Sequence, residues 1–166
     1  EDVIGMFALV RKKTGAKLLL VGDGPERQRM ENLCREYDLC EDVRFLGKLD
    51  AVEELLSVCD LFIMPSEKES FGLAALEAMA CEVPVISSNT GGLPELVIQG
   101  KTGFMSKVGD IEDMAKNALF ILQPENLPQF KSASLARAQE FDIHNILPKY
   151  EAFYEQISFQ SKVVLA

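Results

Sequence analysis

The sequence predicts an α/β domain in which a Rossmann-like parallel sheet is flanked by helices. Short apolar runs alternate with helical patterns along the whole chain, and the connections between them are brief. Glycine or proline stands at the ends of several runs, as is usual at the ends of strands and helices. The 166 residues, 48% of them hydrophobic, suit one domain with a substantial core and exclude a disordered chain.

The N-terminal half contains the first three expected strands. A helix is expected over 2–13, where apolar side chains recur at helical spacing. A second helix is expected to begin at Pro25, because proline suits the first helical position. Apolar runs bounded by turn residues predict strands at 17–22, 43–46 and 61–64, and a short helix is expected over 51–58.

The C-terminal half continues the alternation and then becomes helical. The expected elements are an alanine-rich helix at 72–81, a strand at 83–87, a short helix opened by Gly91, Gly92 and Pro94, a strand at 103–105, a helix capped by Asp110, and helices at 125–140 and 142–158. Pro148 is expected to kink or break the last helix. One domain is therefore expected over residues 1–158, followed by a tail at 159–166.

The composition excludes several classes of partner. The 26 acidic and 17 basic side chains give a net charge of −9, so no overall basic surface for nucleic acid is expected. No apolar run approaches the ~20 residues of a membrane span, and no signal peptide opens the chain. The four cysteines form no C-x-x-C pair, so we expect buried free thiols and a cytoplasmic location. With His144 as the single histidine, no metal site is expected.

Ligands of parallel α/β sheets bind at the carboxyl ends of the strands, which directs attention to the loops 22–25, 65–72 and 88–94. The first loop invites comparison with the G-x-G-x-x-G dinucleotide fingerprint, but Arg27 stands where the third glycine belongs. Asp42, at the right spacing for the ribose-binding acid, precedes its strand instead of following it. A tight turn with some ligand contact is therefore favoured over a nicotinamide or flavin site.

The second loop carries two acidic residues at the start of a helix. Glu69 lies on the loop and Glu77 on the helix that follows, while Gly72 permits close approach of a ligand to the backbone. The first amides of that helix can bind a phosphate. Carboxylates beside such a site are favourable when they accept hydrogen bonds from sugar and ribose hydroxyls. The alternative is a solvated acidic loop before a core helix.

The Glu69-x7-Glu77 pattern stands in a series of linked motifs. The others are Leu20–Glu26, Val43–Gly47, Cys59–Ser66, Pro84–Ile86, Gly91–Glu95, Gly103–Phe104 and Val108–Asp110. In order and spacing this series, which covers about residues 1–158, resembles the family-4 retaining glycosyltransferases. Those enzymes have two Rossmann-like domains with a cleft between them, the GT-B fold, and this chain resembles the second, donor-binding domain.

The resemblance assigns roles to individual residues. It implies that Glu69 contacts the transferred sugar as a catalytic residue, and that Glu77 binds the ribose hydroxyls of a UDP-sugar. It also implies donor contacts around these two residues, at Ser70, Phe71, Gly72, Leu73 and Ala74 for the sugar hydroxyls and β-phosphate, and at Gly22, Gly24, Pro25, Glu26, Phe45, Leu46 and Gly47 for the base and ribose. No cofactor and no metal are implied.

The run 66–73 is most similar to the family members that join N-acetylglucosamine to L-malate in bacillithiol synthesis. Three other functions stay open: a transferase of polysaccharide or glycolipid synthesis, a non-catalytic nucleotide-sugar-binding module, and a sugar-nucleotide epimerase. Glu69 argues against the module, since a sensor needs no carboxylate at the reacting sugar. The epimerases share the two-domain fold without the paired glutamates.

The chain also departs from the family. A strand and a loop with an arginine and a lysine are expected before Glu1, as is an acceptor domain that binds a small-molecule or glycan acceptor. With the strand order 3-2-1-4-5-6 the absent strand would be central. We therefore expect a fragment that is inactive alone and an apolar face on the last helix that lacks its partner. Glu82 stands where the family usually has glycine, so a strained helix cap is expected there.

Overall fold

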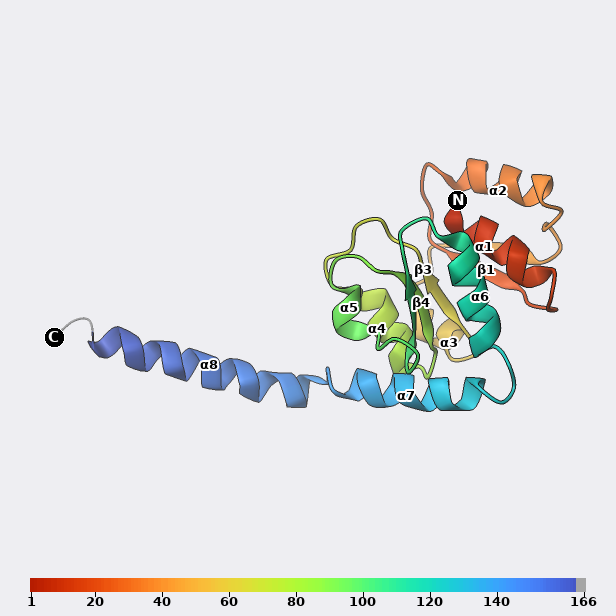
Figure 1. The fold of residues 1–166 in the computed structure, drawn as a ribbon. Coiled ribbons are helices and arrows are strands. Elements are labelled where there is room, and N and C mark those ends of the chain that lie inside the picture. Colours follow the sequence, from red (N-terminus) through yellow and green to blue (C-terminus); the bar gives the residue numbers. More distant parts are fainter. Residues whose placement is uncertain (164–166) are drawn as a thin grey trace.

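The structure, a computed structural model, describes residues 1–163 (Figure 1). Helices and strands alternate as the sequence predicts. In chain order the elements are α1 (Asp2–Arg11), β1 (Leu18–Val21), α2 (Arg27–Glu36), β2 (Val43–Gly47), α3 (Val52–Leu56), β3 (Phe62–Met64), α4 (Leu73–Ala80), β4 (Val85–Ser88), α5 (Leu93–Leu96), β5 (Gly103–Ser106), α6 (Ile111–Ile121), α7 (Leu127–Gln139) and α8 (Ile143–Val163). Within that range no helix is long and apolar enough to cross a membrane.

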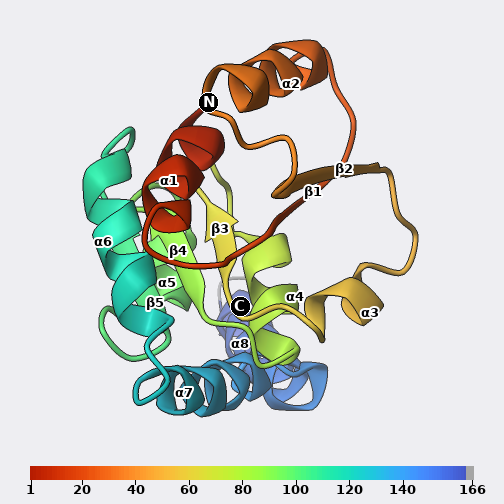
Figure 2. The same cartoon turned by 90° about the vertical axis from the view of Figure 1, so that its right-hand side faces the viewer.

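The strands form two parallel sheets instead of the single expected one. β1 pairs with β2, with Leu18 opposite Val43, while β3, β4 and β5 form a second sheet in which Ile63, Ile86 and Phe104 are neighbours. Helices α1 and α6 lie on one side of β3 and β4, and α4 lies on the other (Figure 2). The carboxyl ends of β3 and β4 point away from α7.

A cavity of about 500 Å³ separates the two sheets. Its lining includes residues of β1 and β3 together with Phe7 and Val10 of α1, and most of these side chains are apolar. The division falls between β1 of the first sheet and β3 of the second. The facing edges of β1 and β3 therefore have no neighbouring strand among the described residues.

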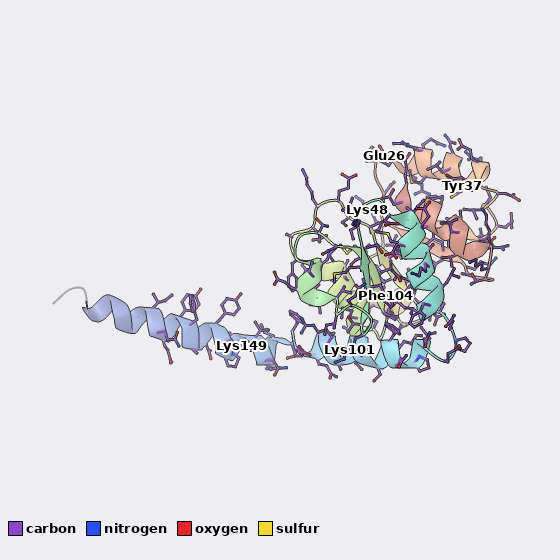
Figure 3. The ribbon with its side chains drawn as sticks, in the orientation of Figure 1. Glu26, Tyr37, Lys48, Lys101, Phe104 and Lys149 are labelled. Carbon is purple, nitrogen blue, oxygen red and sulfur yellow. The ribbon has the colours of Figure 1, made fainter. Side chains whose placement is uncertain are left out.

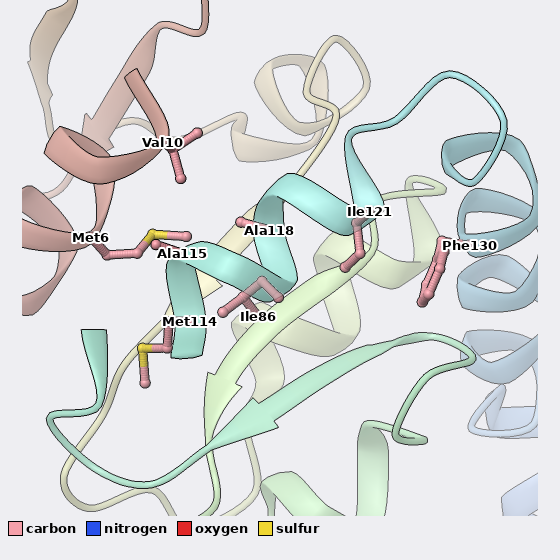
Figure 4. Packing of buried hydrophobic residues seen from close by; sticks show 8 residues of the cluster. All are labelled: Met6, Val10, Ile86, Met114, Ala115, Ala118, Ile121 and Phe130. Atoms are coloured by element: carbon pink, nitrogen blue, oxygen red, sulfur yellow. The ribbon is translucent and has the colours of Figure 1, made fainter. Parts of the chain in front are cut away.

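The main core lies between α6 and the second sheet. Met114, Ala118 and Ile121 of α6 form one buried cluster with Ile86 of β4, and Phe130 of α7 lies at its end near Ile121 (Figure 4). All five side chains are buried. Apolar burial of about 25 cal/mol per Å² at such positions holds the helices on the sheet.

Asp42 has a structural role at the amino ends of β1 and β2. Its buried carboxylate pairs with Lys17 and Arg11, and its carbonyl oxygen accepts the N–H of Leu18 at 2.8 Å. The hydrogen bond from Lys17, and then the one from Arg11, hold the pKa of Asp42 below its usual value. Asp42 thus ties α1 to the first sheet, at the end opposite to the one where a ligand of a parallel sheet binds.

Several local expectations are wrong or incomplete. Pro25 does not open α2: the N–H of Arg27 donates to Gly24 O at 3.2 Å and closes a turn before the helix. Cys40 is exposed, whereas Cys34 is buried, and no cysteine forms a disulfide. α8 continues through Pro148 to Val163, past the expected end at 158, and residues 164–166 of the expected tail lie outside the described range.

The last helix has the exposed apolar face that was expected. α8 projects away from the rest of the domain (Figure 1). Its large exposed side chains are Ile143, Leu147, Tyr150, Phe153, Tyr154 and Ile157. Contiguous apolar surface of this kind is typical of a contact with another part of a protein.

Glu82 adopts the strained conformation that the sequence predicts. Its φ is 62°, and the bonds Val83 N–H to Ala78 O at 2.9 Å and Glu82 N–H to Met79 O at 3.1 Å form a Schellman cap after α4. We expect Glu82→Gly to raise the Tm by roughly 2–8 °C, because a left-handed non-glycine residue costs about 1–2 kcal/mol.

Thermal unfolding followed by circular dichroism measures this shift. Asp38→Gly is the matched control: Asp38 has φ 55° after α2, and aspartate tolerates that conformation better than glutamate. A smaller gain is therefore expected for Asp38→Gly. An unchanged or lower Tm for Glu82→Gly contradicts the strain.

The gap between the sheets predicts a pattern of amide exchange. The N–H of Leu18 donates to Asp42 O on the side of β2, and the N–H of Phe62 donates to Pro84 O on the side of β4. Because successive residues of a strand point their N–H groups to opposite sides, those of Leu19 and Ile63 face the gap. We expect both to exchange at least about tenfold faster than Ile86 in the central strand β4. Residue-resolved hydrogen exchange by NMR measures these rates. Equal protection at all three amides contradicts an open gap.

Candidate functional site

The acidic loop, residues 65–72, leads from β3 into α4. Glu69 Oε1 accepts the backbone N–H groups of Phe71 at 3.3 Å and of Gly72 at 3.1 Å. Gly72, with φ 97°, makes the turn into the helix, where a Cβ would come within 2.7 Å of Leu93. A half-buried carboxylate thus lies at the positive end of α4, where the helix dipole stabilises a negative charge.

This contact corrects part of the sequence analysis. The amides of Phe71 to Ala74 were expected to face a ligand, but in the structure Glu69 itself holds the first two. Leu73 and Ala74 follow in the first turn of α4, where a helix leaves amides without intrahelical partners, and both residues are exposed. The amides of Leu73 and Ala74 are therefore the two of this set that remain available to a ligand.

Glu77 and Ser70 provide further polar groups beside this loop. Both residues are exposed, Ser70 on the loop and Glu77 on α4. Among the described residues the carboxylate of Glu77 has no hydrogen-bond or ion-pair partner, so its oxygens are available to accept hydrogen bonds from hydroxyl groups. No cluster of metal-ligating side chains occurs in the part of the chain that the structure describes.

The loop 88–94 packs directly against the acidic loop. Gly92 N–H donates to Glu69 O at 3.3 Å, and the Thr90 hydroxyl donates to Glu67 O at 3.2 Å. A Cβ on Gly91 would lie 1.6 Å from Glu69 O, so no other residue fits there without movement of the backbone. From the sequence, the Gly91-Gly92 pair was expected to open a short helix within the candidate ligand loop 88–94, without a contact to Glu69. Its closeness to Glu69 depends on the packing of two loops that are far apart in the sequence.

The first loop forms a second cluster with the end of β2. Gly22 N–H donates to Gly47 O at 2.7 Å, and the guanidinium of Arg27 lies 5.8 Å from the ring centroid of Phe45. The expected contacts Leu46, Pro25 and Glu26 are exposed around this turn, although Glu26 also pairs with Arg29 at 3.3 Å. Figure 3 shows Glu26 and Lys48 at the end of the domain opposite to α7.

The glycines of this cluster border open space. No atom lies within 4 Å of a Cβ built on Gly22, Gly24 or Gly47. A flat ligand can therefore approach their backbone closely. The expected site residues thus form two clusters, one around Gly22 and Gly47 on the first sheet and one around Glu69 on the second.

Sequence comparisons identify relatives of known type. A family model described as glycosyl transferases group 1 matches residues 1–133. N-acetyl-alpha-D-glucosaminyl L-malate synthase of Bacillus anthracis is 41% identical over 159 residues, which are 95% of this chain and 42% of that protein. Glycogen synthase of Mycobacterium tuberculosis is 38% identical over 117 residues, 69% of this chain and 28% of that protein. The chain thus spans less than half the length of both relatives.

Solved structures share the fold. Sucrose-phosphate synthase from Thermosynechococcus elongatus superposes with a TM-score of 0.82 at 32% identity, over 96% of this chain and 42% of that one. The Anabaena protein HepE, in complex with UDP, gives a TM-score of 0.83 at 27% identity, over 92% of this chain and 44% of that one.

The open space at Gly24 predicts an effect on ligand binding. We expect Gly24→Ala to weaken the binding of a flat ligand at this turn about fivefold or more, since about 1 kcal/mol of lost contact is enough for such a change. Folding should be unaffected, because Gly24 has no positive φ and its Cβ meets nothing. Gly15→Ala, equally unhindered but outside both clusters, is the control. NMR titration with UDP measures both affinities, and equal values for the two variants contradict a ligand at this turn.

Proposed function

Because the chain belongs to the group 1 glycosyltransferases, we propose that it is the donor-binding domain of a retaining enzyme that uses a UDP-sugar. Its parallel strands flanked by helices match the GT-B architecture of its structural neighbours. The observation that carries the proposal is the acidic loop: Glu69 lies at the N-terminus of α4, with Glu77 exposed on the same helix.

In this proposal the two glutamates have different ligands. Glu77 accepts hydrogen bonds from the ribose hydroxyls of UDP, and the cluster around Gly22 and Gly47 lies against the uracil and ribose. Glu69 accepts a hydroxyl of the transferred sugar, and the amides of Leu73 and Ala74 face the β-phosphate. HepE supports UDP as the nucleotide, because it was solved with UDP and shares this fold.

The proposed reaction exchanges one bond at the anomeric carbon for another. The bond to the β-phosphate oxygen breaks, and the acceptor hydroxyl forms its bond on the same face of the sugar. The acceptor proton goes to the departing phosphate, which leaves as UDP. Helix amides that point at the phosphate stabilise the charge that develops there.

For the acceptor we propose L-malate and for the sugar N-acetylglucosamine. The support is the 41% identity to N-acetyl-alpha-D-glucosaminyl L-malate synthase over 95% of the chain. A glucan acceptor is the second candidate, because glycogen synthase is 38% identical over a shorter stretch. A cytoplasmic location, inferred from the free cysteines, belongs to the same proposal.

The full-length enzyme separates these acceptors. Release of UDP from UDP-N-acetylglucosamine is followed with L-malate, with an oligoglucan and with no acceptor. Turnover that depends on malate supports the first candidate, and turnover that depends on the glucan supports the second. UDP binding without turnover on malate or on the glucan would contradict both candidates.

The two glutamates are expected to affect different kinetic constants. Glu77→Gln should raise the KM for the donor with kcat little changed, because a charge-assisted contact present in ground and transition states is worth about 1.5–3 kcal/mol. Glu69→Gln should lower kcat about 100-fold or more, because its contact strengthens as positive charge develops on the sugar. Glutamine can still accept the N–H groups of Phe71 and Gly72, so the loop is expected to keep its shape.

Glu67→Gln is the control, since Glu67 is exposed on the same loop and its carboxylate has no partner among the described residues. Steady-state kinetics of the three variants in the full-length enzyme decide the assignment. Equal, small effects of all three substitutions would mean that the loop is merely a solvated acidic surface.

A further inference from the structure

The junction between α7 and α8 contacts the acidic loop through an aromatic pair. The ring of Phe141 meets the ring of Phe71 edge to face, with 5.8 Å between centroids and 65° between planes. Phe71 is the residue whose N–H donates to Glu69. Both rings pack on the buried cluster of α4 and β4 that includes Ala75 and Val85. The side chain of Phe141 therefore limits where the backbone of Phe71 can move.

Arg137, in α7, connects the same junction to α5. Its guanidinium lies 4.8 Å from the ring centroid of Phe141, a cation–π geometry. Its Nε donates to Leu96 O at 3.2 Å, and its Nη2 donates to Glu95 O. These carbonyls belong to α5, which directly follows the Gly91-Gly92 pair that contacts Glu69. Phe141 thus contacts the acidic loop directly through Phe71, whereas Arg137 contacts α5, which follows the glycine pair beside Glu69.

The same junction begins α8. Asp142, the next residue, accepts the N–H of His144 at 2.8 Å at the start of the helix. Beyond it α8 projects from the domain with its apolar face exposed (Figure 1). Phe141 therefore lies between the start of α8 and the acidic loop.

We propose that Phe141 is a positioning residue for the donor site and links the start of α8 to the acidic loop. This inference rests on the proposed function, because it concerns the site that binds the UDP-sugar. Phe141 itself touches no ligand. Its ring keeps Phe71 packed, so that the amides of Phe71 and Gly72 stay in the arrangement in which Glu69 holds them.

Amide exchange tests the positioning role without any ligand. We expect Phe141→Ala to accelerate exchange of the Phe71 and Gly72 amides about tenfold relative to Ile86 in the core of the second sheet, because the loss of a packed ring opens the loop locally. If Phe141→Ala does not fold, the same exchange is measured on Phe141→Leu, which removes the ring but keeps an apolar side chain. Phe141→Tyr should restore wild-type rates within about twofold, because the ring is retained and the half-buried side chain can turn its hydroxyl to solvent. Phe153→Ala, on the exposed face of α8, is the matched control.

A second measurement uses donor kinetics in the full-length enzyme. Phe141→Ala and Phe141→Leu should lower kcat about fivefold with the donor KM changed less than about twofold, because the loosened amides hold Glu69, whose contact acts in the transition state. Phe141→Tyr should keep both kinetic constants at their wild-type values. Unchanged relative exchange at Phe71 and Gly72 in both ring-deleted variants would overturn the positioning role. If the Phe141 variants exchange faster but the wild-type protein binds no UDP, the proposed function is rejected, whereas the contact between Phe141 and the acidic loop is still supported.

Discussion

The candidate site depends on the position of the Glu69 carboxylate, which is fixed from several directions. Its Oε1 accepts two backbone N–H groups at the start of α4, and its carbonyl oxygen accepts the N–H of Gly92. Two of these N–H groups belong to the turn into α4 and the third to the loop after β4, so both segments must be in place before Glu69 is. The parallel sheet provides that placement, since the carboxyl ends of adjacent strands meet at one edge.

Much of the fold follows from the sequence because strands that are covered on both faces must be continuously apolar. The run Leu18–Val21 is wholly apolar, and β4 begins with the buried pair Val85 and Ile86. Asp110 caps α6 as expected, with its side chain accepting the N–H of Asp113 at 3.1 Å. The start of α2 was missed because proline also suits a turn, and the bond from Arg27 to Gly24 favours the turn here.

The site was predicted less completely than the fold. The spacing of Glu69 and Glu77 identified the loop, but the expectation of free amides overlooked a carboxylate that can reach the N–H groups two and three residues ahead. The contacts of Gly91 with Glu69 and of Phe141 with Phe71 join segments distant in sequence, and no local pattern reports such pairs. The division of the sheet separates the two clusters of expected donor contacts, one on each sheet.

We propose that a UDP-sugar binds across both clusters, and an NMR titration of the labelled chain with UDP-N-acetylglucosamine tests this most directly. Saturable shift changes are expected in the amides of residues 22–26, 45–47 and 69–77 and near Phe141, with the amides of α7 unaffected. Changes confined to residues that line the apolar gap, or spread evenly over the surface, would contradict it.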